Sequence, residues 1–438
     1  MEQSFLIQKL INAAIQAADP LCFIPKTLRL NGSILEIGRR TYDLTQYHSI
    51  YSIAVGKAAP RMSFALNELI GERITKGIVL AKHFDLSYPL PERFEICFGG
   101  HPVPTEGSLI GTQKILSLLA ETTEHDLVLF LISGGGSALM TAPREGITLS
   151  EMQAVSSALL GCGTSIQEFN TVRKHLDRVK GGGLAAAAAP SEYVTIVLSD
   201  VIGNPLESIA SGPTVPDHGT FEEAVSILKR YELWESLPNS VSQVLLKGMS
   251  GEIPETLKAD DPIFQKGYSL IAADNRQAAR AAAETAAKMG FKAHILTTAL
   301  CGEAKDVGAL LPSFFSEVTL KKDSAVLIFG GETTVHLRGE GTGGRNMELA
   351  LAAVRGMAKF PNCTLLSLAT DGEDGPTDAA GAVVDRETLE KGLLLGLAPE
   401  AFLERNDSYH FFERVGGLLK LGPSGTNVND LCFLIYQP

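Results

Sequence analysis

A run of three glycines between two serines follows directly after a stretch of apolar residues. The segment LFLISGGGSALM covers residues 129–140. Glycine loses much backbone entropy on folding, so a run of glycines indicates that another group comes close to the backbone. Backbone N–H groups at the start of a helix bind anions, and a phosphate is the first candidate, with a plain strand-to-helix turn as the alternative. The residues expected to bind the anion are Ser133, Gly134, Gly135, Gly136 and Ser137.

Two cationic side chains stand where a predicted helix begins, which is the end of a helix that disfavours positive charge. Lys57 lies in AVGKAA, and Arg345 lies in GGETTVHLRGEGTGGRNMELAL. A lysine reaches a phosphate as a point charge, whereas an arginine offers a planar fork to carboxylate or phosphate oxygens. Each therefore predicts a neighbouring anion, against the alternatives of a solvated lysine and a flexible hairpin. We also expect Glu332 and Asn346, from the same glycine-rich segment, to contact a ligand.

Several carboxylates follow the end of a later predicted strand. The segment LATDGEDGPTDAAGAVVD, residues 368–385, contains Asp371, Asp374 and Asp378. Clustered carboxylates repel one another and tend to bind a cation. Their spacing does not match the EF-hand pattern for calcium, so we expect a magnesium ion shared with nucleotide phosphates. An ordinary acidic surface loop is the alternative.

A fourth segment, VLSDVIGNPLESIASGPTVPD, continues another strand over residues 197–217. Asp200 in this segment is expected to bind a metal ion or to act as a base, and an N-cap role is the alternative. Asn204, together with Ser211 and Gly212, is expected to shape the adjacent pocket.

A basic segment, FNTVRKHLDRVKGGGLA, covers residues 169–185. Its cations Arg173, Lys174, His175 and Lys180 either form a wall for an anion or are the solvated face of a helix.

The elements that must position these residues alternate between apolar strands and amphipathic or alanine-rich helices. The strands are predicted at residues 49–56, 77–82, 126–133, 193–200, 268–274, 292–298, 324–331 and 364–372. The helices are predicted at residues 60–69, 108–122, 149–163 and 275–290, the third with Ser150 as its N-cap. This alternation predicts an α/β fold with mostly parallel sheets, in which ligands bind beyond the carboxyl ends of the strands.

The bulk composition fits a globular protein of two domains. The chain has 438 residues, of which 45% are hydrophobic and 20% charged. We expect domains at residues 1–255 and 256–438, joined through LKADDPIF. The net charge of −12 argues against nonspecific binding to nucleic acid or to an anionic membrane.

The sequence also lacks the features of several protein classes. It shows no membrane-spanning run or signal peptide, and its six cysteines form no C-x-x-C pair, so we expect a cytoplasmic protein without structural zinc. The missing P-loop, protein-kinase and G-x-S-x-G motifs exclude those enzyme classes. The missing G-x-G-x-x-G after the first strand weakens a nicotinamide-dependent dehydrogenase.

Taken together, these segments resemble the glycerate 2-kinase family, whose C-terminal part is the MOFRL domain. The resemblance rests on AVGKAA, FLISGGGSALM, TVRKHLDRVKGGGLA, LSDVIGNPLESIASGPTVPD, GGETTV with GTGGRNMELAL, ATDGEDGPTDAAGAVVD and TNVNDL, which follow the family's order over nearly the whole chain. The sequence departs from the family's pattern at Gly183, where arginine is expected, at Met347, where glutamine is usual, and at Asn204, where aspartate is common.

The resemblance implies ATP-dependent phosphorylation of D-glycerate to 2-phosphoglycerate with Mg2+. It also implies a Rossmann-like N-terminal domain, a smaller C-terminal α/β domain and an active site in the cleft between them. The family's important lysine and arginine correspond to Lys57 and Arg345. We expect these two to neutralise the moving phosphoryl group, while Asp200 and one or more acids of the 368–385 loop bind magnesium or orient the 2-hydroxyl.

Two other functions stay open at this point. Some family members are labelled hydroxypyruvate reductase, so an NAD(P)H-dependent reductase is the second reading, and a non-catalytic protein that binds a sugar acid or a nucleotide is the third. The choice of the 2-hydroxyl over the 3-hydroxyl rests on the resemblance alone. The expected partners are D-glycerate and ATP, with no nucleic acid and no membrane, and a homodimer remains open.

Overall fold

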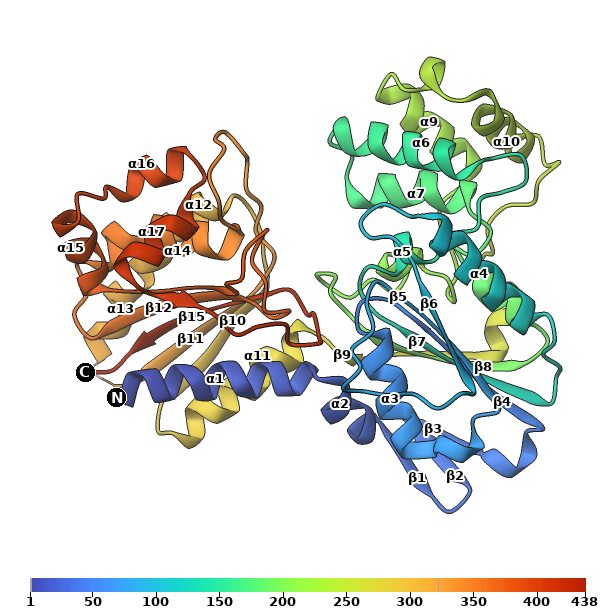
Figure 1. Ribbon diagram of the computed structural model, residues 1–438, viewed down its shortest axis with the longest axis horizontal. Helices are drawn as coiled ribbons and strands as arrows, with labels where there is room; N and C mark the ends of the chain where they lie inside the picture. The colour runs from blue at the N-terminus through green and yellow to red at the C-terminus, as the bar shows by residue number, and fades with distance from the viewer. Residues whose placement is uncertain (1, 322) are drawn as a thin grey trace. The chain divides into compact units, whose positions relative to one another are not determined.

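The computed structural model of the protein describes residues 2–321 and 323–438, and the chain divides into two compact units (Figure 1). One unit comprises residues 23–272, and the other combines residues 2–22 with residues 273–438. This division differs from the predicted domains, 1–255 and 256–438, at both ends of the first. The predicted strand at 268–274 adds to the first sheet rather than opening the second, and the N-terminal helix packs in the C-terminal unit.

The unit of residues 23–272 is built on a mostly parallel sheet of six strands. In spatial order the strands are β6 (Phe94–Phe98), β5 (Lys76–Ala81), β4 (Ser49–Val55), β7 (Asp126–Ile132), β8 (Glu192–Leu198) and β9 (Gly267–Ala273). Every pair from β6 to β8 is parallel. The first five strands therefore follow the order of doubly wound sheets. From β4 the chain first adds strands on one side, β5 and β6, and then on the other, β7 and β8, so the switch point lies between β4 and β7. In such sheets, ligands bind beyond the carboxyl ends at this switch point.

The residues of the central strand explain its place. Strand β7 reads DLVLFLI and is buried throughout, as expected for a strand covered on both faces. Helices α3 (Ala59–Ile70) and α4 (Glu106–Leu119) lie on opposite faces of the sheet (Figure 1). Two short helices, α5 (Gly136–Leu139) and α8 (Gly183–Ala188), follow glycine runs.

A group of four helices stands beyond α5 in the same unit (Figure 1). Its members are α6 (Leu149–Gly161), α7 (Ile166–Leu176), α9 (Phe221–Arg230) and α10 (Asn239–Met249). They enclose a core of their own, which includes Phe169 and Phe221. The N-cap of α6 is Thr148 and not the predicted Ser150, because Thr148 and Glu151 form a reciprocal capping box.

Smaller elements of this unit precede the main sheet. Helix α2 (Pro20–Thr27) leads into an antiparallel sheet of β1 (Leu28–Asn31), β2 (Ile34–Ile37) and β3 (Arg40–Asp43), which the sequence analysis does not predict.

The second unit contains a mixed sheet of six strands. In spatial order they are β10 (Lys292–Leu300), β11 (Ala325–Gly331), β15 (Asp430–Tyr436), β12 (Cys363–Ala369), β13 (Gly381–Asp385) and β14 (Leu418–Leu419). Within this sheet, as far as the structure describes it, β10 and β11 pair in parallel and the other neighbouring strands pair antiparallel. Strand β15 runs antiparallel between β11 and β12, so its first residue, Asp430, lies opposite Gly331 and Ala369, where those two strands end.

Helices cover both faces of the mixed sheet (Figure 1). Helices α1 (Glu2–Ala18) and α11 (Asn275–Lys288) pack together on one face. The other helices are α12 (Ala304–Leu310), α13 (Phe315–Val318), α14 (Arg345–Met357), α15 (Arg386–Leu394), α16 (Pro399–Glu404) and α17 (Ser408–Val415). The N-terminal helix is anchored by a hydrogen bond of 2.6 Å from Thr426 Oγ1 to the carbonyl of Ala18. Within the described ranges, no helix has both the length and the apolar character to span a bilayer.

Candidate active site

The loops that follow β4 and β7 are held against each other by hydrogen bonds. The N–H of Ser133 donates to the carbonyl of Val55 at 2.9 Å, and the N–H of Lys57 donates to the carbonyl of Gly134 at 2.9 Å. The hydroxyl oxygen of Ser133 accepts from the N–H of Ala58 at 3.1 Å. The structure therefore brings the predicted lysine and the predicted glycine loop together at the switch point of the sheet.

The glycine loop carries two amide donors that the protein itself does not use. In the part of the chain that the structure describes, the N–H groups of Gly134 and Gly135 donate to no other group. Gly134 is buried, and Gly135 has a φ of +81°, which favours glycine. Buried N–H groups without a partner are rare, so this pair indicates a ligand that accepts hydrogen bonds.

The glycines also admit neighbouring side chains. A Cβ atom on Gly134 would lie 1.8 Å from Oδ2 of Asp200, so the Asp200 carboxylate packs against the loop backbone. A Cβ on Gly135 would lie 2.9 Å from Cδ2 of His101 and 3.3 Å from Cγ of Lys57. The close approach that the sequence predicts is thus made in part by the protein's own residues.

The two basic side chains beside Gly135 differ in exposure. Lys57 is exposed and makes no ion pair or hydrogen bond through its ammonium group to any described residue. Burial, together with the charges of Lys57 and Lys82, lowers the pKa of His101 to about 4. His101 is therefore neutral at pH 7, and Lys57 supplies the positive charge. No motif in the sequence marks His101.

Ser137, at the end of the glycine loop, is held by a chain of polar side chains. Its hydroxyl lies 2.8 Å from the hydroxyl of Ser211, which donates to Oδ1 of Asn170 at 3.1 Å. Ser211 and its neighbour Ala210 have φ values of +63° and +49°. Left-handed backbone at residues other than glycine is strained, and such strain gathers at functional sites.

Asn204 lies in the same segment and also has a left-handed φ, of +57°. Its N–H donates to the carbonyl of Val201 at 3.0 Å, which closes the turn after Asp200.

Three of the four basic side chains in this segment are buried against carboxylates. Lys174 pairs with Asp217 at 3.0 Å, Lys180 with Asp177 at 2.8 Å, and the ring of His175 with Glu255 at 3.1 Å. These three side chains are therefore neither an open anion wall nor a solvated face.

The second unit contains a separate cluster around Arg345, the first residue of α14. Its Nε and Nη2 donate to both oxygens of Asp430, at 2.6 and 3.1 Å, and its Nη1 donates to Glu332 at 2.5 Å. The anion that its position predicts is thus supplied by the protein. Burial raises the pKa of Asp430 to about 7, although Arg345 opposes the shift. Asp430 is not among the predicted site residues, and its only signal in the sequence is the TNVNDL segment.

Asp374 and Asn346 form the buried N-terminal cap of α14. Asp374 accepts from the N–H groups of Asn346 at 3.1 Å and Met347 at 2.8 Å. The side chain of Asn346 donates to Asp374 and accepts from the hydroxyl of Ser367 at 2.6 Å. Burial raises the pKa of Asp374 to about 6. The predicted ligand contact of Asn346 is therefore occupied by the protein's own groups.

The three acids predicted to bind magnesium each contact a different protein group. Asp374 caps α14, Asp378 is exposed and contacts Lys420 at 2.8 Å, and Asp371 accepts from the N–H of Glu373 at 3.2 Å. Among the described residues, no group of three histidine, cysteine or acidic side chains is arranged to hold a metal ion. The magnesium ion shared with nucleotide phosphates stays a prediction, and no step below depends on it.

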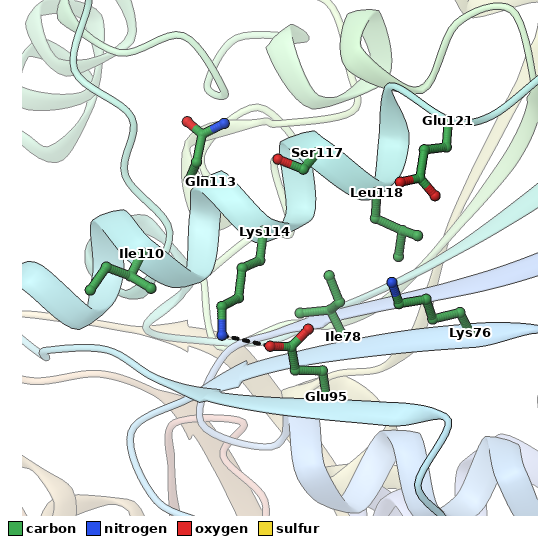
Figure 2. A pocket seen from close by; sticks show the side chains of 9 residues that line it. All are labelled: Lys76, Ile78, Glu95, Ile110, Gln113, Lys114, Ser117, Leu118 and Glu121. Atoms are coloured by element: carbon green, nitrogen blue, oxygen red, sulfur yellow. Dashed lines mark hydrogen bonds and ion pairs between the residues drawn. The ribbon is translucent and has the colours of Figure 1, made fainter.

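The residues that line the pocket in Figure 2 belong to none of these clusters. It opens between α4 and strands β5 and β6, with Ile78 and Leu118 between helix and sheet and an ion pair of 2.5 Å between Lys114 and Glu95. None of the predicted site residues lines it. A cavity of about 10 Å³, the size of one water molecule, adjoins Asp430 in the second unit.

Known proteins resemble this chain over nearly its whole length. Residues 6–246 match a family described as a domain of unknown function (DUF4147), and residues 325–430 match the MOFRL family. A Pyrococcus horikoshii protein named glycerate 2-kinase is 40% identical over 432 residues, 98% of this chain and 96% of that protein. A D-glycerate 2-kinase from Thermotoga maritima is 44% identical over 385 residues, 86% of this chain and 88% of that protein. The chain belongs to the glycerate 2-kinase family.

The fold agrees with that of a solved member of the glycerate 2-kinase family. A crystal structure of a glycerate kinase from Thermotoga maritima superimposes with a TM-score of 0.87 at 39% identity, and covers 100% of both chains. The resemblance that the motifs indicate is therefore confirmed. Two other similar proteins, both from Agrobacterium vitis and 36% and 38% identical, carry the name hydroxypyruvate reductase.

Two departures from the glycerate 2-kinase pattern have a structural counterpart. A Cβ atom on Gly183 would lie 2.0 Å from the carbonyl oxygen of Arg178, so this backbone admits no side chain there. Met347 is buried and contributes its N–H, not its side chain, to the cap by Asp374. A change of side chain at this position leaves the cap's hydrogen bond in place.

Proposed function

We propose that this protein transfers the γ-phosphoryl group of ATP to the 2-hydroxyl of D-glycerate, with 2-phospho-D-glycerate and ADP as products. The observation that carries the proposal is the pair of unused amide donors at Gly134 and Gly135, beside Lys57 and Asp200. The names of similar proteins supply the substrate class and the donor. Phosphoryl transfer needs alignment and charge neutralisation more than covalent chemistry, which suits a site of this kind.

In the first unit, each group has a distinct part in the proposal. Gly134 and Gly135 donate hydrogen bonds to an anionic group, either the substrate carboxylate or a phosphate. Lys57, which is exposed and has no competing carboxylate among the described residues, neutralises the phosphoryl group as it moves. Asp200 accepts a hydrogen bond from the 2-hydroxyl and takes its proton as the oxygen attacks phosphorus. Asn204 and the Ser137–Ser211 pair fix the backbone next to Asp200 and the glycine loop.

In the second unit, Arg345 has two anchored nitrogens and one that can be shared. Its bonds to the buried Asp430 fix the guanidinium plane, and Nη1 reaches the half-exposed Glu332. We propose that a phosphate oxygen takes over Nη1 from Glu332 during the reaction, because an arginine fork binds phosphate as well as carboxylate. Asn346 and Asp374 then act by fixing the start of α14.

The test is an incubation of the purified protein with D-glycerate and ATP in buffer containing Mg2+, followed by phosphorus NMR. The expected result is a 2-phosphoglycerate signal that grows with ADP. A 3-phosphoglycerate signal keeps the kinase and overturns the position, and an arm with chelator measures the need for Mg2+. A parallel tube with NADH and hydroxypyruvate covers the reductase, and consumption of NADH without any phosphorylated product overturns the proposal.

A further inference from the structure

Arg173, on helix α7, is the one residue not paired with a carboxylate among four described basic side chains of the segment at residues 169–185, which are Arg173, Lys174, His175 and Lys180. Its guanidinium stacks on the ring of Phe169, with 4.0 Å between its central carbon and the ring centroid. Within residues 2–321 and 323–438 it makes no hydrogen bond and no ion pair, although it is half-buried. Stacking fixes the plane of a guanidinium and leaves its N–H edge free to bind a planar anion.

The helix spacing shows which way Arg173 faces. Asn170 and Arg173 are three residues apart on α7 and share one of its faces, and Asp177 is the extended residue that directly follows the helix. Asn170 at one end of this face accepts from Ser211, whose hydroxyl contacts Ser137. Asp177, just past the helix, accepts from the hydroxyl of Thr141, which follows α5. Asn170 therefore reaches the glycine loop through Ser211, and Asp177 contacts the chain that continues that loop.

The carboxylate that follows Arg173 most closely in the sequence, Asp177, already accepts hydrogen bonds from four other groups. Asp177 accepts from Thr141 Oγ1, from the N–H groups of Ala142 and Val179, and from the ammonium of Lys180, at 2.7–3.2 Å. With Lys180 on its carboxylate, Asp177 leaves the charge of Arg173 without a counterion. Burial lowers the pKa of Arg173 to about 10, which Asp177 only partly offsets.

A second cation adds to this imbalance. Arg144 lies within electrostatic reach of Asp177, its guanidinium stands over the ring of Phe221, and its buried Nε has no partner among the described residues. Cations held out of water need compensating anions. Glu255 also acts on Arg144, so two carboxylates, Asp177 and Glu255, face the three cations Arg144, Arg173 and Lys180. This excess of positive charge favours an incoming anion.

We propose that Arg173 binds the carboxylate group of the 2-hydroxy acid substrate, as a planar two-point contact beside the glycine loop. This inference rests on the proposed kinase function and deepens it, because it assigns the substrate's carboxylate to Arg173 and leaves the Gly134 and Gly135 amides to a phosphate. It also explains how such an enzyme separates sugar acids from neutral polyols, since only an acid satisfies the unpaired guanidinium.

The experiment compares D-glycerate with D-glyceramide, its uncharged carboxamide, in wild-type protein and in Arg173→Met. Loss of a hydrogen-bonded charge contact lowers kcat/KM for glycerate by about 10- to 150-fold. The value for glyceramide should stay within about twofold, so the preference for the acid collapses. Arg173→Lys keeps the charge without the fork and should fall between the two. The matched control is Arg178→Met, an exposed arginine five residues away, which should leave both values unchanged.

Each outcome decides the assignment. An equal loss for both substrates shows that Arg173 acts on structure alone and overturns it, as does an unchanged preference for the acid. Calorimetric binding of D-glycerate separates the two proposals. If the wild-type protein binds glycerate but transfers no phosphoryl group, and Arg173→Met does not bind glycerate, the kinase is refuted and the carboxylate contact stands. A wild-type protein that does not bind glycerate overturns both. If Arg173→Met is unfolded by circular dichroism, Arg173→Lys carries the same comparison.

Discussion

Replacing Gly134 with alanine should abolish most of the activity while the protein stays folded. A Cβ atom at this position would lie 1.8 Å from Oδ2 of Asp200 and 2.5 Å from its Cγ. Contacts of a Cβ under 3.0 Å essentially do not occur, so the carboxylate must move by at least about 1.2 Å. Misplacing a reacting group by about 1 Å costs roughly 100-fold in rate, and we expect kcat/KM to fall by about that factor.

The cost to folding should be much smaller. The φ of Gly134 lies outside the left-handed region, so an alanine backbone is not strained there. The atoms it meets belong to the end of a side chain that can rotate away, and we expect a loss of about 1–3 kcal/mol in the free energy of unfolding. Steady-state kinetics with D-glycerate and ATP, together with urea unfolding, measure the two effects separately.

The control and the refuting result follow from the same geometry. Gly161→Ala adds a methyl group where no atom lies within 4 Å, and it should leave kcat/KM unchanged. In Asp200→Ser the shorter side chain makes room, so adding Gly134→Ala to it should cost almost nothing further. A Gly134→Ala enzyme with kcat/KM within threefold of wild type would show that Asp200 is not needed in its observed position.

Three further predictions concern charged residues. Lys57→Met should lower kcat by about 10²- to 10³-fold with no change in unfolding temperature, because this exposed side chain stabilises nothing else; a large drop in that temperature would contradict its assignment. Arg345→Met leaves the buried Asp430 carboxylate without its cation and should cost about 3–5 kcal/mol in urea unfolding. An unchanged midpoint would refute the buried pairing of Arg345 with Asp430. Burial raises the pKa of Asp374 to about 6, so the folded state holds this proton more tightly than the unfolded chain. The contribution of Asp374 to the free energy of unfolding, about 3 kcal/mol, is fully present below about pH 4 and is lost as the pH rises through about 6. Asp374→Asn should remove that slope, and parallel pH profiles of the two proteins would disprove the shift.

The sequence predicts five of the six strands of the first sheet, where buried strands are continuous apolar runs that end in glycine or a polar residue. In the second sheet it predicts only β10, β11 and β12, and it misses the central strand β15. It does not predict which sheet a strand joins. The run at 268–274 reads like any other buried strand, and only its pairing partner places it beside β8 rather than in the second unit. The small sheet of β1 to β3 consists of strands of four residues each, too short for a clear alternation.

The part of the site that the sequence predicts correctly is the pairing of Lys57 with the glycine loop. Lys57 and the glycine loop meet because both follow adjacent strands of a parallel sheet. The acids of the 368–385 loop were harder to interpret, because a carboxylate that caps a helix and one that binds a metal look alike in a sequence. Asp374 has the first role, with two backbone N–H groups as partners. The sequence also does not show that Arg345 pairs with Asp430, because Asp430 lies 85 residues further along the chain.

The placement of α1 has a consequence for how the protein is made. Its buried face, with Leu6, Leu10 and Ala14, packs in the unit that contains α11, which begins at Asn275. The ribosome therefore releases this apolar helix more than 250 residues before its partner exists. At translation speeds of about 5–20 residues per second, the helix waits for roughly 10–50 s. During that time the 23–272 unit can fold as an insertion, while the first helix remains a candidate for chaperone capture.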